Sequence, residues 1–431
     1  MSNATMAAGG GGVRARPSLG LVAGTVTVNA LEFYDFIGYI FFAAQIGKAF
    51  FPAVNPLVSL LSSLAVFAVG FFFRPVGGLI IGAYADRAGR RPAMILTITL
   101  ITIGTMGLIL TPTFATIGVA APIIVVFWRC LQGFALGGDV GPATSYLVEI
   151  APDGQRGFYG AWQIASQGAS ALVAGIVGLA LFSILGAPAM AAWGWRLVFL
   201  VGLLLIPLGL YLRKNMQETL SSTSAESGKV QFSWLAENPW LLFKLLFLVI
   251  GGTVATYVGL AMPGLAVFVL KYPQFVIFPV VIVYGLSTLV GGLLGGTISD
   301  RLGRKTAMIA PYALLWVTIY FAFHLLTTAH NYAVLFGVTA WIGVLVSMSA
   351  GASLTMGPEI LPARIRAFGM SVIYALGVTI FGGTTPFVIQ ALTAHFHNPM
   401  VTPLYVMALG ALALIAMFSM PETKNKVLDR G

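Results

Sequence analysis

Residues 82–91 read GAYADRAGRR and residues 296–305 read GTISDRLGRK, so the pattern Gly-x-x-x-Asp-Arg-x-Gly-Arg-Arg/Lys occurs twice, 214 positions apart. Each copy joins the end of one long apolar run to the start of the next. A second pair of landmarks repeats at nearly the same offset, Glu149-Ile150-Ala151-Pro152 with Arg156 and Glu359-Ile360-Leu361-Pro362 with Arg366. Two duplicated landmarks at almost one spacing indicate two parallel halves, an arrangement found in membrane transporters.

The duplicated pattern resembles the signature loop of the major facilitator superfamily of transporters. Its glycine lets two helices approach closely, and its Asp and Arg residues suit a cytoplasmic gate locked by charge pairing. The alternative is a merely basic loop that sets membrane orientation, but two copies at matching offset favour the gate. We expect Asp86 and Asp300 to pair with basic residues across the cytoplasmic face when such a carrier opens outward. The candidate gating residues are Gly82, Asp86, Arg87, Arg90, Asp300, Arg301 and Arg304.

The composition excludes a soluble globular protein, because 58% of the 431 residues are hydrophobic and only 8% are charged. The net charge of +10 does not indicate nucleic-acid binding, since the basic residues are spread over short loops. Cys130 is the single cysteine, which rules out an intramolecular disulfide and a cysteine-based metal site. The four histidines lie near predicted helix ends, and no other metal-ligating residues accompany them in the sequence. We expect neither a metal nor another cofactor, and no enzyme activity, because no nucleophile–base set is visible.

Twelve apolar runs are long enough, at about 20 residues each, to cross a bilayer. They cover 18–45, 57–85, 92–111, 118–148, 158–184, 194–213, 240–270, 275–299, 306–327, 331–356, 367–393 and 401–420. The sequence therefore predicts an all-α membrane protein with twelve transmembrane helices in two six-helix pseudo-symmetric halves. The expected domains are a flexible tail at 1–17, a first bundle at 18–213, a polar linker at 214–239, a second bundle at 240–420 and a tail at 421–431.

Lys and Arg residues are distributed unequally between the two sets of loops. The termini and even-numbered loops hold 17 of them, whereas the odd-numbered loops hold three. This asymmetry predicts that both termini are cytoplasmic. We expect a monomeric multi-pass protein of the cell inner membrane, with the lipid bilayer as its surroundings.

Five charged residues lie near mid-membrane depth in the predicted spans, where a charge costs about 3 kcal/mol and usually faces a cavity or a partner. They are Glu32, Asp35, Arg74, Arg129 and Asp139, all in the first half. The two guanidinium groups suit a bidentate grip on carboxylates. The three acids are candidate proton carriers, because burial disfavours the charged form of a carboxyl group. The alternative is that these charges only neutralise one another between helices, which is also the interpretation we favour for Glu149 and Glu359.

Neutral polar side chains in several runs complete the candidate substrate site. Gln132 lies near Arg129, Gln163 and Gln167 form a stripe at helical spacing, and the second half contributes hydroxyl groups. A break at Gly382-Gly383-Thr384-Thr385-Pro386 suggests a bent helix beside a cavity. The candidate substrate-binding residues are Arg74, Arg129, Gln132, Gln163, Gln167, Tyr257, Tyr374 and Thr384. A hydroxyl group in a helix more often bonds to its own backbone, and this alternative applies to each Thr and Tyr.

A closer resemblance rests on several motifs spread over almost all twelve runs. They are NALEFYDF at 29–36, RPVG at 74–77, LQGF at 131–134, WGWR at 193–196 and FGGTTP at 381–386. These motifs resemble the bacterial metabolite–proton symporter family, and within it the citrate and tricarballylate symporters. Asp139 departs from the family pattern, which generally has Glu there.

The resemblance implies proton-coupled uptake of a small organic anion, a di- or tricarboxylate such as citrate, by alternating access. The alternative within transport is a zwitterionic osmolyte of the betaine or proline type. A membrane receptor or channel without a transport cycle is the alternative from a different class, and the doubled gate loop argues against it.

Overall fold

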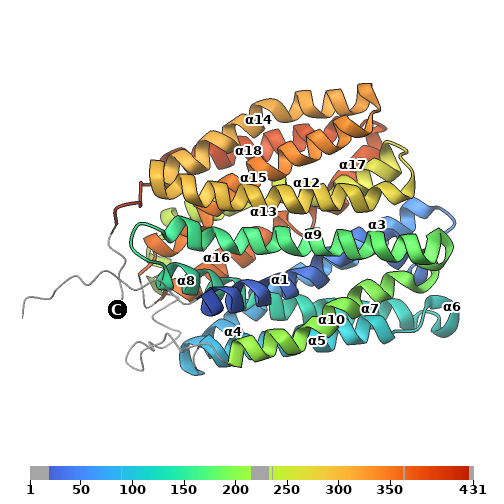
Figure 1. Cartoon of the computed structure of the whole chain (residues 1–431), viewed down its shortest axis with the longest axis horizontal. Helices are drawn as coiled ribbons and strands as arrows, with labels where there is room; N and C mark the ends of the chain where they lie inside the picture. The colour runs from blue at the N-terminus through green and yellow to red at the C-terminus, as the bar shows by residue number, and fades with distance from the viewer. Residues whose placement is uncertain (1–18, 89, 215–232, 235, 363–364, 427–431) are drawn as a thin grey trace, which may run out of the picture.

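The computed structural model describes residues 19–88, 90–214, 233–234, 236–362 and 365–426, and these are helices joined by short loops (Figure 1). The first half contains α1 (Leu19–Phe41), α2 (Ala43–Phe50), α3 (Pro56–Phe72), α4 (Arg74–Ala88), α5 (Arg90–Leu110), α6 (Phe114–Ile117), α7 (Ala120–Gly137), α8 (Val140–Ile150), α9 (Arg156–Ala189), the π-helical turn η1 (Met190–Gly194) and α10 (Trp195–Lys214). The predicted tail at 1–17 and most of the predicted linker lie outside the described residues.

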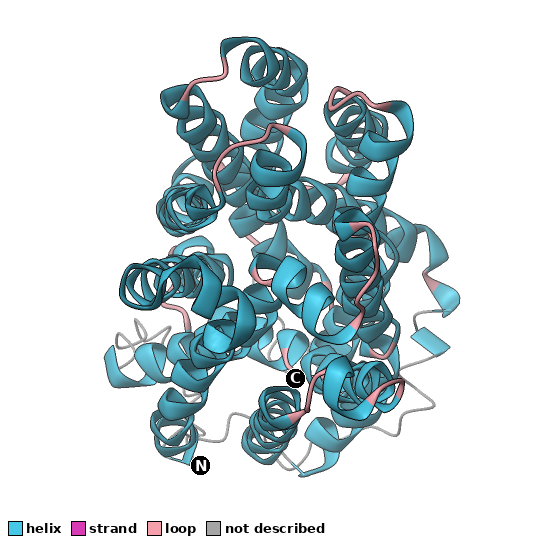
Figure 2. Ribbon diagram, turned by 90° about the vertical axis from the view of Figure 1, so that its right-hand side faces the viewer, coloured by secondary structure: helices cyan, strands magenta, loops and turns pink. Residues whose placement is uncertain are grey.

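The second half contains α12 (Pro239–Gly264), the π-helical turn η2 (Leu265–Val269), the 3₁₀ turn η3 (Gln274–Val276), α13 (Ile277–Leu302), α14 (Arg304–Ala329), α15 (Tyr332–Ile360), α16 (Arg366–Phe381), α17 (Thr385–Phe396) and α18 (Val401–Ser419). Figure 2 shows most helices nearly end-on, so they run side by side along one direction. Their outward faces carry large apolar side chains, such as Ile184 and Leu204, which are 78% and 70% exposed. An apolar outer surface around parallel helices is what a bilayer requires.

Ten helical stretches in the described residues are long and apolar enough to cross a membrane, and the pair 24–41 and 43–50, bent by 68°, makes an eleventh. One of the ten, Arg156–Leu204, has 49 residues. As one straight helix it would be about 74 Å long, more than twice the thickness of the hydrocarbon core. Gly186 interrupts it with φ 74° and ψ 170°, so α9 and α10 are separate passes. The total of twelve spans confirms the predicted fold class.

The two halves meet along α9 and α13, which lie side by side in Figure 1. Glycines on both helices allow this contact. A Cβ atom at Gly168 would overlap Leu289, and one at Gly285 would overlap Leu172. Gly296, in the second signature pattern, faces Gly157 in the same way, so the close approach expected from the pattern is present here.

Glycines also press α7 against α3 and α4 within the first half. A Cβ atom at Gly77 would overlap the Phe134 carbonyl oxygen, and one at Gly133 would overlap that of Gly70. Gly137 meets the backbone of Arg74. This contact places the buried Arg74 and Arg129 side chains inside the first half.

Three predicted runs are broken helices. Residues 18–45 become α1 and α2, 57–85 become α3 and α4, and 118–148 become α7 and α8. The last break falls at Gly138 and Asp139, so Asp139 sits at the N-terminus of α8 and not in the middle of one helix. The expected break at 382–386 is also present, between α16 and α17. Apolar composition continues across each of these breaks, which is why sequence alone did not reveal the first three.

Candidate functional site

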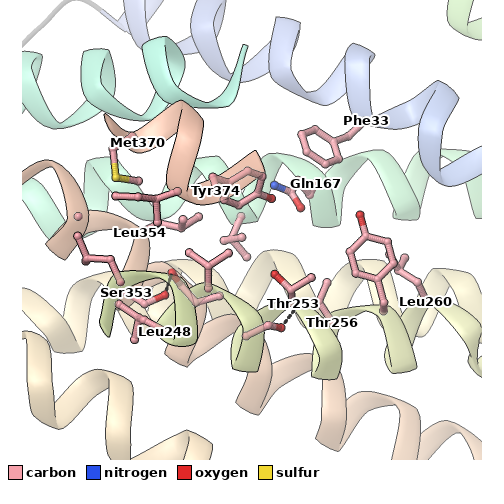
Figure 3. A pocket seen from close by; sticks show the side chains of 18 of the residues that line it. Phe33, Gln167, Leu248, Thr253, Thr256, Leu260, Ser353, Leu354, Met370 and Tyr374 are labelled. Atoms are coloured by element: carbon pink, nitrogen blue, oxygen red, sulfur yellow. Dashed lines mark hydrogen bonds between the residues drawn. The ribbon is translucent and has the colours of Figure 1, made fainter. Parts of the chain in front are cut away.

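A cavity lies between the two halves (Figure 3). The first half lines it from α1 and α9, and the second half lines it from α12, α15 and α16. Three predicted substrate-binding residues line this cavity, namely Gln167, Tyr257 and Tyr374.

The polar side chains that line the cavity are all neutral at neutral pH. They are Gln167, Thr253, Thr256, Tyr257, Ser353 and Tyr374. The Tyr374 hydroxyl group interacts with the Gln167 side chain across the boundary between the halves, and Figure 3 shows the two facing one another. The Thr256 hydroxyl group donates to Gly252 O at 2.8 Å. The second half thus supplies hydroxyl groups to the cavity, as expected. The Thr256 hydroxyl group, however, bonds to the backbone of its own helix.

Arg74 lies directly behind this lining, at the start of α4. Its side chain is 2% exposed, and its guanidinium carbon stands 4.0 Å from the centre of the Phe71 ring and 4.6 Å from that of Phe36. The guanidinium also interacts with the Tyr257 hydroxyl group, which lines the cavity. Among the described residues, Arg74 Nε and Nη2 have no hydrogen-bond partner. Arg74 Nε and Nη2 are therefore hydrogen-bond donors of a buried cation that lies beside the cavity.

Arg129, on α7, is held differently. Its Nη1 donates to Gln132 Oε1 at 2.6 Å and lies 3.8 Å from Asp35 Oδ2. Gln132 Nε2 in turn donates to Asp35 Oδ2 at 2.8 Å and to Thr105 Oγ1 at 3.0 Å. The Tyr39 ring lies 4.2 Å from the guanidinium carbon. Arg129, Gln132, Asp35 and Thr105 therefore form one buried network inside the first half, here called the Asp35 network.

Phe36 connects the cavity with the Asp35 network. It follows Asp35 on α1, lines the cavity, and stands 4.6 Å from the Arg74 guanidinium carbon and 5.7 Å from that of Arg129. A cation near an aromatic face is attracted to it. A shift of this one ring therefore changes the surroundings of both arginines.

Glu32 and Asp139 are 1% exposed and lie on either side of Thr97, on α5. The three predicted proton-coupling acids therefore belong to two neighbouring groups within the first half. Thr97 and Thr105 were missed by sequence reasoning, because a threonine in an apolar run is ordinarily bonded to its own helix and nothing in the sequence separates these two from the others.

Like Arg129 and Gln132, two further predicted substrate-binding residues do not line the cavity. Gln163 exchanges hydrogen bonds with Asn29, donating to Asn29 Oδ1 at 3.0 Å. Thr384, between α16 and α17, donates to the Ile380 carbonyl oxygen of α16. Helical spacing placed Gln163 on the same side of α9 as Gln167. Gln163 lies about one turn nearer the start of α9, where it bonds to Asn29 of α1.

The signature loops and both described chain ends lie at one end of the molecule, here called the loop end (Figure 1). There, Asp300 accepts hydrogen bonds from Gly157 N at 2.7 Å and Phe158 N at 2.8 Å, at the start of α9. It also accepts from Arg304 Nη1 at 2.7 Å. Across the halves, Asp300 thus binds a helix N-terminus, which favours a carboxylate, where we expected a basic side chain.

The second duplicated landmark pairs reciprocally at the loop end. Glu149 of the first half binds Arg366 of the second at 3.1 Å, and Arg156 of the first half lies 3.9 Å from Glu359 of the second. Glu359 also binds Arg304 at 2.8 Å. These contacts join the two halves, so Glu149 and Glu359 do pack helices, as we favoured, but across the boundary between the halves.

The carboxyl end of the chain packs onto the same place. Glu422 accepts hydrogen bonds from Arg304 N at 2.8 Å and Lys305 N at 3.0 Å, at the start of α14. Gly303 precedes them with φ 103°, a left-handed conformation, and a Cβ atom there would meet the Glu422 carboxylate. Arg156 Nη1 donates to Lys426 O at 2.8 Å, which ties this tail to the first half. Partial burial opposes ionisation of Glu422, but the backbone N–H donors outweigh it and hold the pKa of Glu422 below its usual range.

The first signature loop is described less fully than the second. Gly82 on α4 faces Phe368 at ordinary contact distance, so its close approach is looser than that of Gly296. The side chains of Asp86, Arg87 and Arg90 lie outside the described residues. Arg301 is exposed, and its carbonyl oxygen accepts from Lys424 Nζ at 2.7 Å.

Twelve spans in two parallel halves, with a cavity between them and charge pairs joining the halves at one end, define a membrane transporter. The chain matches the sequence profile of the Major Facilitator Superfamily over residues 36–386, and it belongs to that family. It is a transporter and not an enzyme, as predicted.

Relatives with different cargoes are similar to the chain over most of their length. A citrate-proton symporter of Klebsiella pneumoniae is 34% identical over 94% of this chain and 91% of its own. A proline/betaine transporter of Salmonella typhimurium is 32% identical over 93% and 83%. An alpha-ketoglutarate permease of Escherichia coli is 30% identical over 86% of each chain. The resemblance to the metabolite symporters is thus confirmed.

The fold is also similar to a solved structure. The proton:xylose symporter XylE bound to 6-bromo-6-deoxy-D-glucose superimposes with a TM-score of 0.78, covering 95% of this chain and 97% of its own, at 17% identity. This likeness supports the fold.

Proposed function

We propose that the chain is a proton symporter that imports a small organic anion, a di- or tricarboxylate such as citrate, by alternating access. The observation that carries the proposal is Arg74, whose Nε and Nη2 are unpaired among the described residues beside the cavity. The names of the citrate and alpha-ketoglutarate relatives support the same class of cargo.

Arg74 would bind one carboxylate of the substrate. A guanidinium offers donors in a planar fork that matches a carboxylate, and its burial between Phe36 and Phe71 strengthens the attraction. Tyr257, Tyr374 and Gln167 would donate to the remaining oxygen atoms of the substrate. The contact of Tyr374 with Gln167 joins the two halves, so a substrate inserted there touches both.

Arg129 and Gln132, in contrast, would serve proton coupling together with Asp35. A proton on Asp35 removes the negative charge beside Arg129 and weakens the hold of the carboxylate on Gln132. Phe36, next to Asp35, would transmit this change to the Arg74 side of the cavity. An anion that enters a negatively charged compartment needs such compensating protons.

Alternating access would proceed by release of the loop end. Opening there breaks the pairs Glu149–Arg366 and Arg156–Glu359, and separates Asp300 from the start of α9. We assign the loop end to the cytoplasm of a cell inner membrane, because 17 Lys and Arg residues lie in the termini and even-numbered loops and three in the others. Residues 18–213 and 240–420 would be the two moving domains.

A zwitterionic osmolyte of the betaine or proline type is the second candidate. The observation in its favour is the aromatic lining of the cavity by Phe33, Phe36 and Tyr257, because aromatic faces bind quaternary ammonium groups. The proline/betaine relative supports it as well. Both candidates use Arg74 for a carboxylate and differ in what surrounds the rest of the substrate.

Reconstituted protein in proteoliposomes separates the two candidates. Uptake of labelled citrate, alpha-ketoglutarate and glycine betaine is measured with and without an inward proton gradient. We expect gradient-driven accumulation of a carboxylate, inhibited by other polycarboxylates and not by betaine. Accumulation of betaine alone would replace the first candidate by the second, and absence of any gradient effect would contradict symport.

A further inference from the structure

Gly252 lies on the side of α12 that faces the cavity. It lines the cavity, as do Leu248 and Thr256, one turn before and one turn after it. A Cβ atom at Gly252 would meet no atom of another helix within 4 Å. At Gly357, another glycine of the lining, a Cβ atom would instead overlap the Met370 side chain. The space beside Gly252 therefore belongs to the cavity and not to a packed neighbour.

The usual structural reasons for a glycine do not apply to Gly252. The preceding residue, Gly251, has no room for a Cβ atom because Ala413 packs against it. Gly118 and Gly154 border open space as Gly252 does, but their φ angles are positive, which favours glycine. Gly252 lies inside α12 without a positive φ angle. Because glycine destabilises a helix interior relative to alanine, its presence here points to a use of the open space.

The open space lies a short distance from Arg74 along the cavity. Tyr257, five residues after Gly252 on α12, interacts with the Arg74 guanidinium group. α12 begins at the loop end, where Lys244 Nζ donates to Ser419 O. At 1.5 Å per residue, Gly252 is therefore about 7.5 Å nearer the loop end than Tyr257. Most residues that line the cavity from α12 precede Tyr257, so a substrate held at Arg74 by one carboxylate would extend past Gly252.

The walls around Gly252 are neutral. Thr253 and Thr256 lie on the same helix, across the cavity from Gln167 and Tyr374 (Figure 3). The lining formed by the described residues contains no charged side chain. A group of the substrate that passes Gly252 is therefore not selected by an ion pair. Its size and shape decide whether it fits, because a wall without a side chain admits a branch that a methyl group would exclude.

We propose that Gly252 is a specificity-determining residue, whose missing side chain admits a branch on the substrate. The proposal rests on the proposed function and deepens it, because it selects among organic acids that share a terminal carboxylate. Citrate carries a hydroxyl and a carboxyl group on the central carbon of a five-carbon chain. Glutarate has the same chain without these two groups. Citrate therefore needs the space beside Gly252, and glutarate does not.

Gly252→Ala and Gly252→Val fill this space with side chains of increasing size. Gly337→Ala and Gly337→Val are the matched controls, since Gly337 on α15 is exposed, lies outside the cavity lining and is equally open to a Cβ atom. Calorimetry on the purified protein gives the dissociation constants of citrate and glutarate without any transport. In a Cys130→Ser background, Gly252→Cys and Gly337→Cys are labelled with a maleimide, with and without citrate. Thermal unfolding of each variant monitors the fold.

We expect the dissociation constant of citrate to rise about tenfold in Gly252→Ala, the scale for one methyl group that does not fit, and further in Gly252→Val. That of glutarate should stay within about threefold of the parent value. Both Gly337 variants should bind like the parent, and neither alanine variant should be less stable, because alanine favours a helix. Citrate should slow labelling at position 252 and not at 337. Equal weakening of citrate and glutarate, no weakening of either, or labelling at 252 that citrate does not slow would overturn the proposal.

Binding by the parent separates this proposal from the proposed function. A parent that binds glutarate and not citrate would overturn the role of Gly252 alone. A parent that binds neither acid but binds glycine betaine would overturn the organic-anion proposal. The same variants are then compared for glycine betaine and N,N-dimethylglycine, which lacks one methyl group. Size selection at Gly252 requires that Gly252→Ala weaken glycine betaine more, and equal weakening would overturn it. A parent that binds none of these ligands would overturn both proposals.

Discussion

The interior of the first half and the cavity between the halves both contain buried polar side chains, yet their arginines have different surroundings. In the Asp35 network, Arg129 already has a carboxylate, an amide and an aromatic ring around it. Beside the cavity, Arg74 has aromatic rings and a tyrosine hydroxyl group but no carboxylate among its described neighbours. A buried cation without a counter-charge attracts an anion from outside, whereas a neutralised one responds to protonation of its partner. The two arginines, similar in sequence context, therefore suit different tasks.

Asp35→Asn is the change with the largest expected effect on this comparison. It keeps the size of the side chain and its hydrogen bond with Gln132 but removes the titrating group. Gradient-driven uptake in proteoliposomes should fall about a hundredfold, the lower range for loss of a proton-transfer group, while substrate exchange persists. Glu237→Gln, at an exposed residue just before α12, is the control and should behave like the parent. If Asp35→Asn still accumulates substrate against its gradient, coupling does not pass through the Asp35 network.

Arg74→Lys and Arg129→Lys sharpen the comparison, because each keeps the charge and loses the planar fork. Calorimetric binding of the transported polycarboxylate should weaken by about 2 kcal/mol, or about 30-fold, in Arg74→Lys. In Arg129→Lys we expect binding within about threefold and a loss of gradient-driven uptake. Arg196→Lys is the matched control, since Arg196 donates to backbone carbonyl groups away from the cavity. Equal weakening in both variants would mean that Arg129 is also a carboxylate ligand.

The reciprocal pairs at the loop end predict a smaller effect, on turnover and not on binding. Replacement of Glu149 or Arg366 by Gln should raise the fraction of molecules open at the loop end, measured by cysteine labelling from that side. The coupling energy between the two changes should be about 1 kcal/mol, because the Glu149 side chain is 23% exposed and its ion pair is partly screened. Substrate affinity should remain within about twofold. A coupling energy of zero would mean that the Glu149–Arg366 ion pair does not stabilise the closed loop end.

Glu422→Gln is expected to have the smallest effect, and it depends on pH. The native pKa of Glu422 lies below its ordinary value, so the carboxylate contributes its full stabilisation above the unfolded pKa. That contribution is lost as the pH falls through the native pKa. The parent should therefore exceed Glu422→Gln in thermal stability at neutral pH, and the difference should vanish on acidification. A difference that grows toward acid pH would contradict the backbone hydrogen bonds as its source.

Sequence reasoning was most successful for charged residues, whose burial inside an apolar span costs free energy. Glu32, Asp35, Arg74, Arg129 and Asp139 stood out because a charge inside an apolar run needs a partner, and the structure buries all five. It was weaker for neutral side chains. Gln163, Gln167 and Thr384 carry no such cost, so nothing in the sequence showed that Gln167 faces the cavity while the other two bond to Asn29 and Ile380.

The duplicated landmarks also separate what the sequence predicts from what only the structure shows. Their spacing predicted two equivalent halves, but not that Glu149 of one half would bind Arg366 of the other, and Arg156 would approach Glu359. Likewise, the pattern predicted a contact of Asp300 across the halves, but with a basic side chain. Its partners across the halves are instead backbone N–H groups at the N-terminus of α9. Side-chain identities in a sequence do not show where such free N–H groups will lie.

The sequence by itself determined the class of this protein, the number of its spans and the set of charges inside them. These follow from local properties, since an apolar run of sufficient length enters a bilayer whatever its neighbours are. Only the tertiary structure decided which arginine is neutralised and which is left beside the cavity. That outcome depends on glycines that bring α7 against α3 and α4 and on helix rotations that set which side chains meet, and both are relations between segments far apart in the chain.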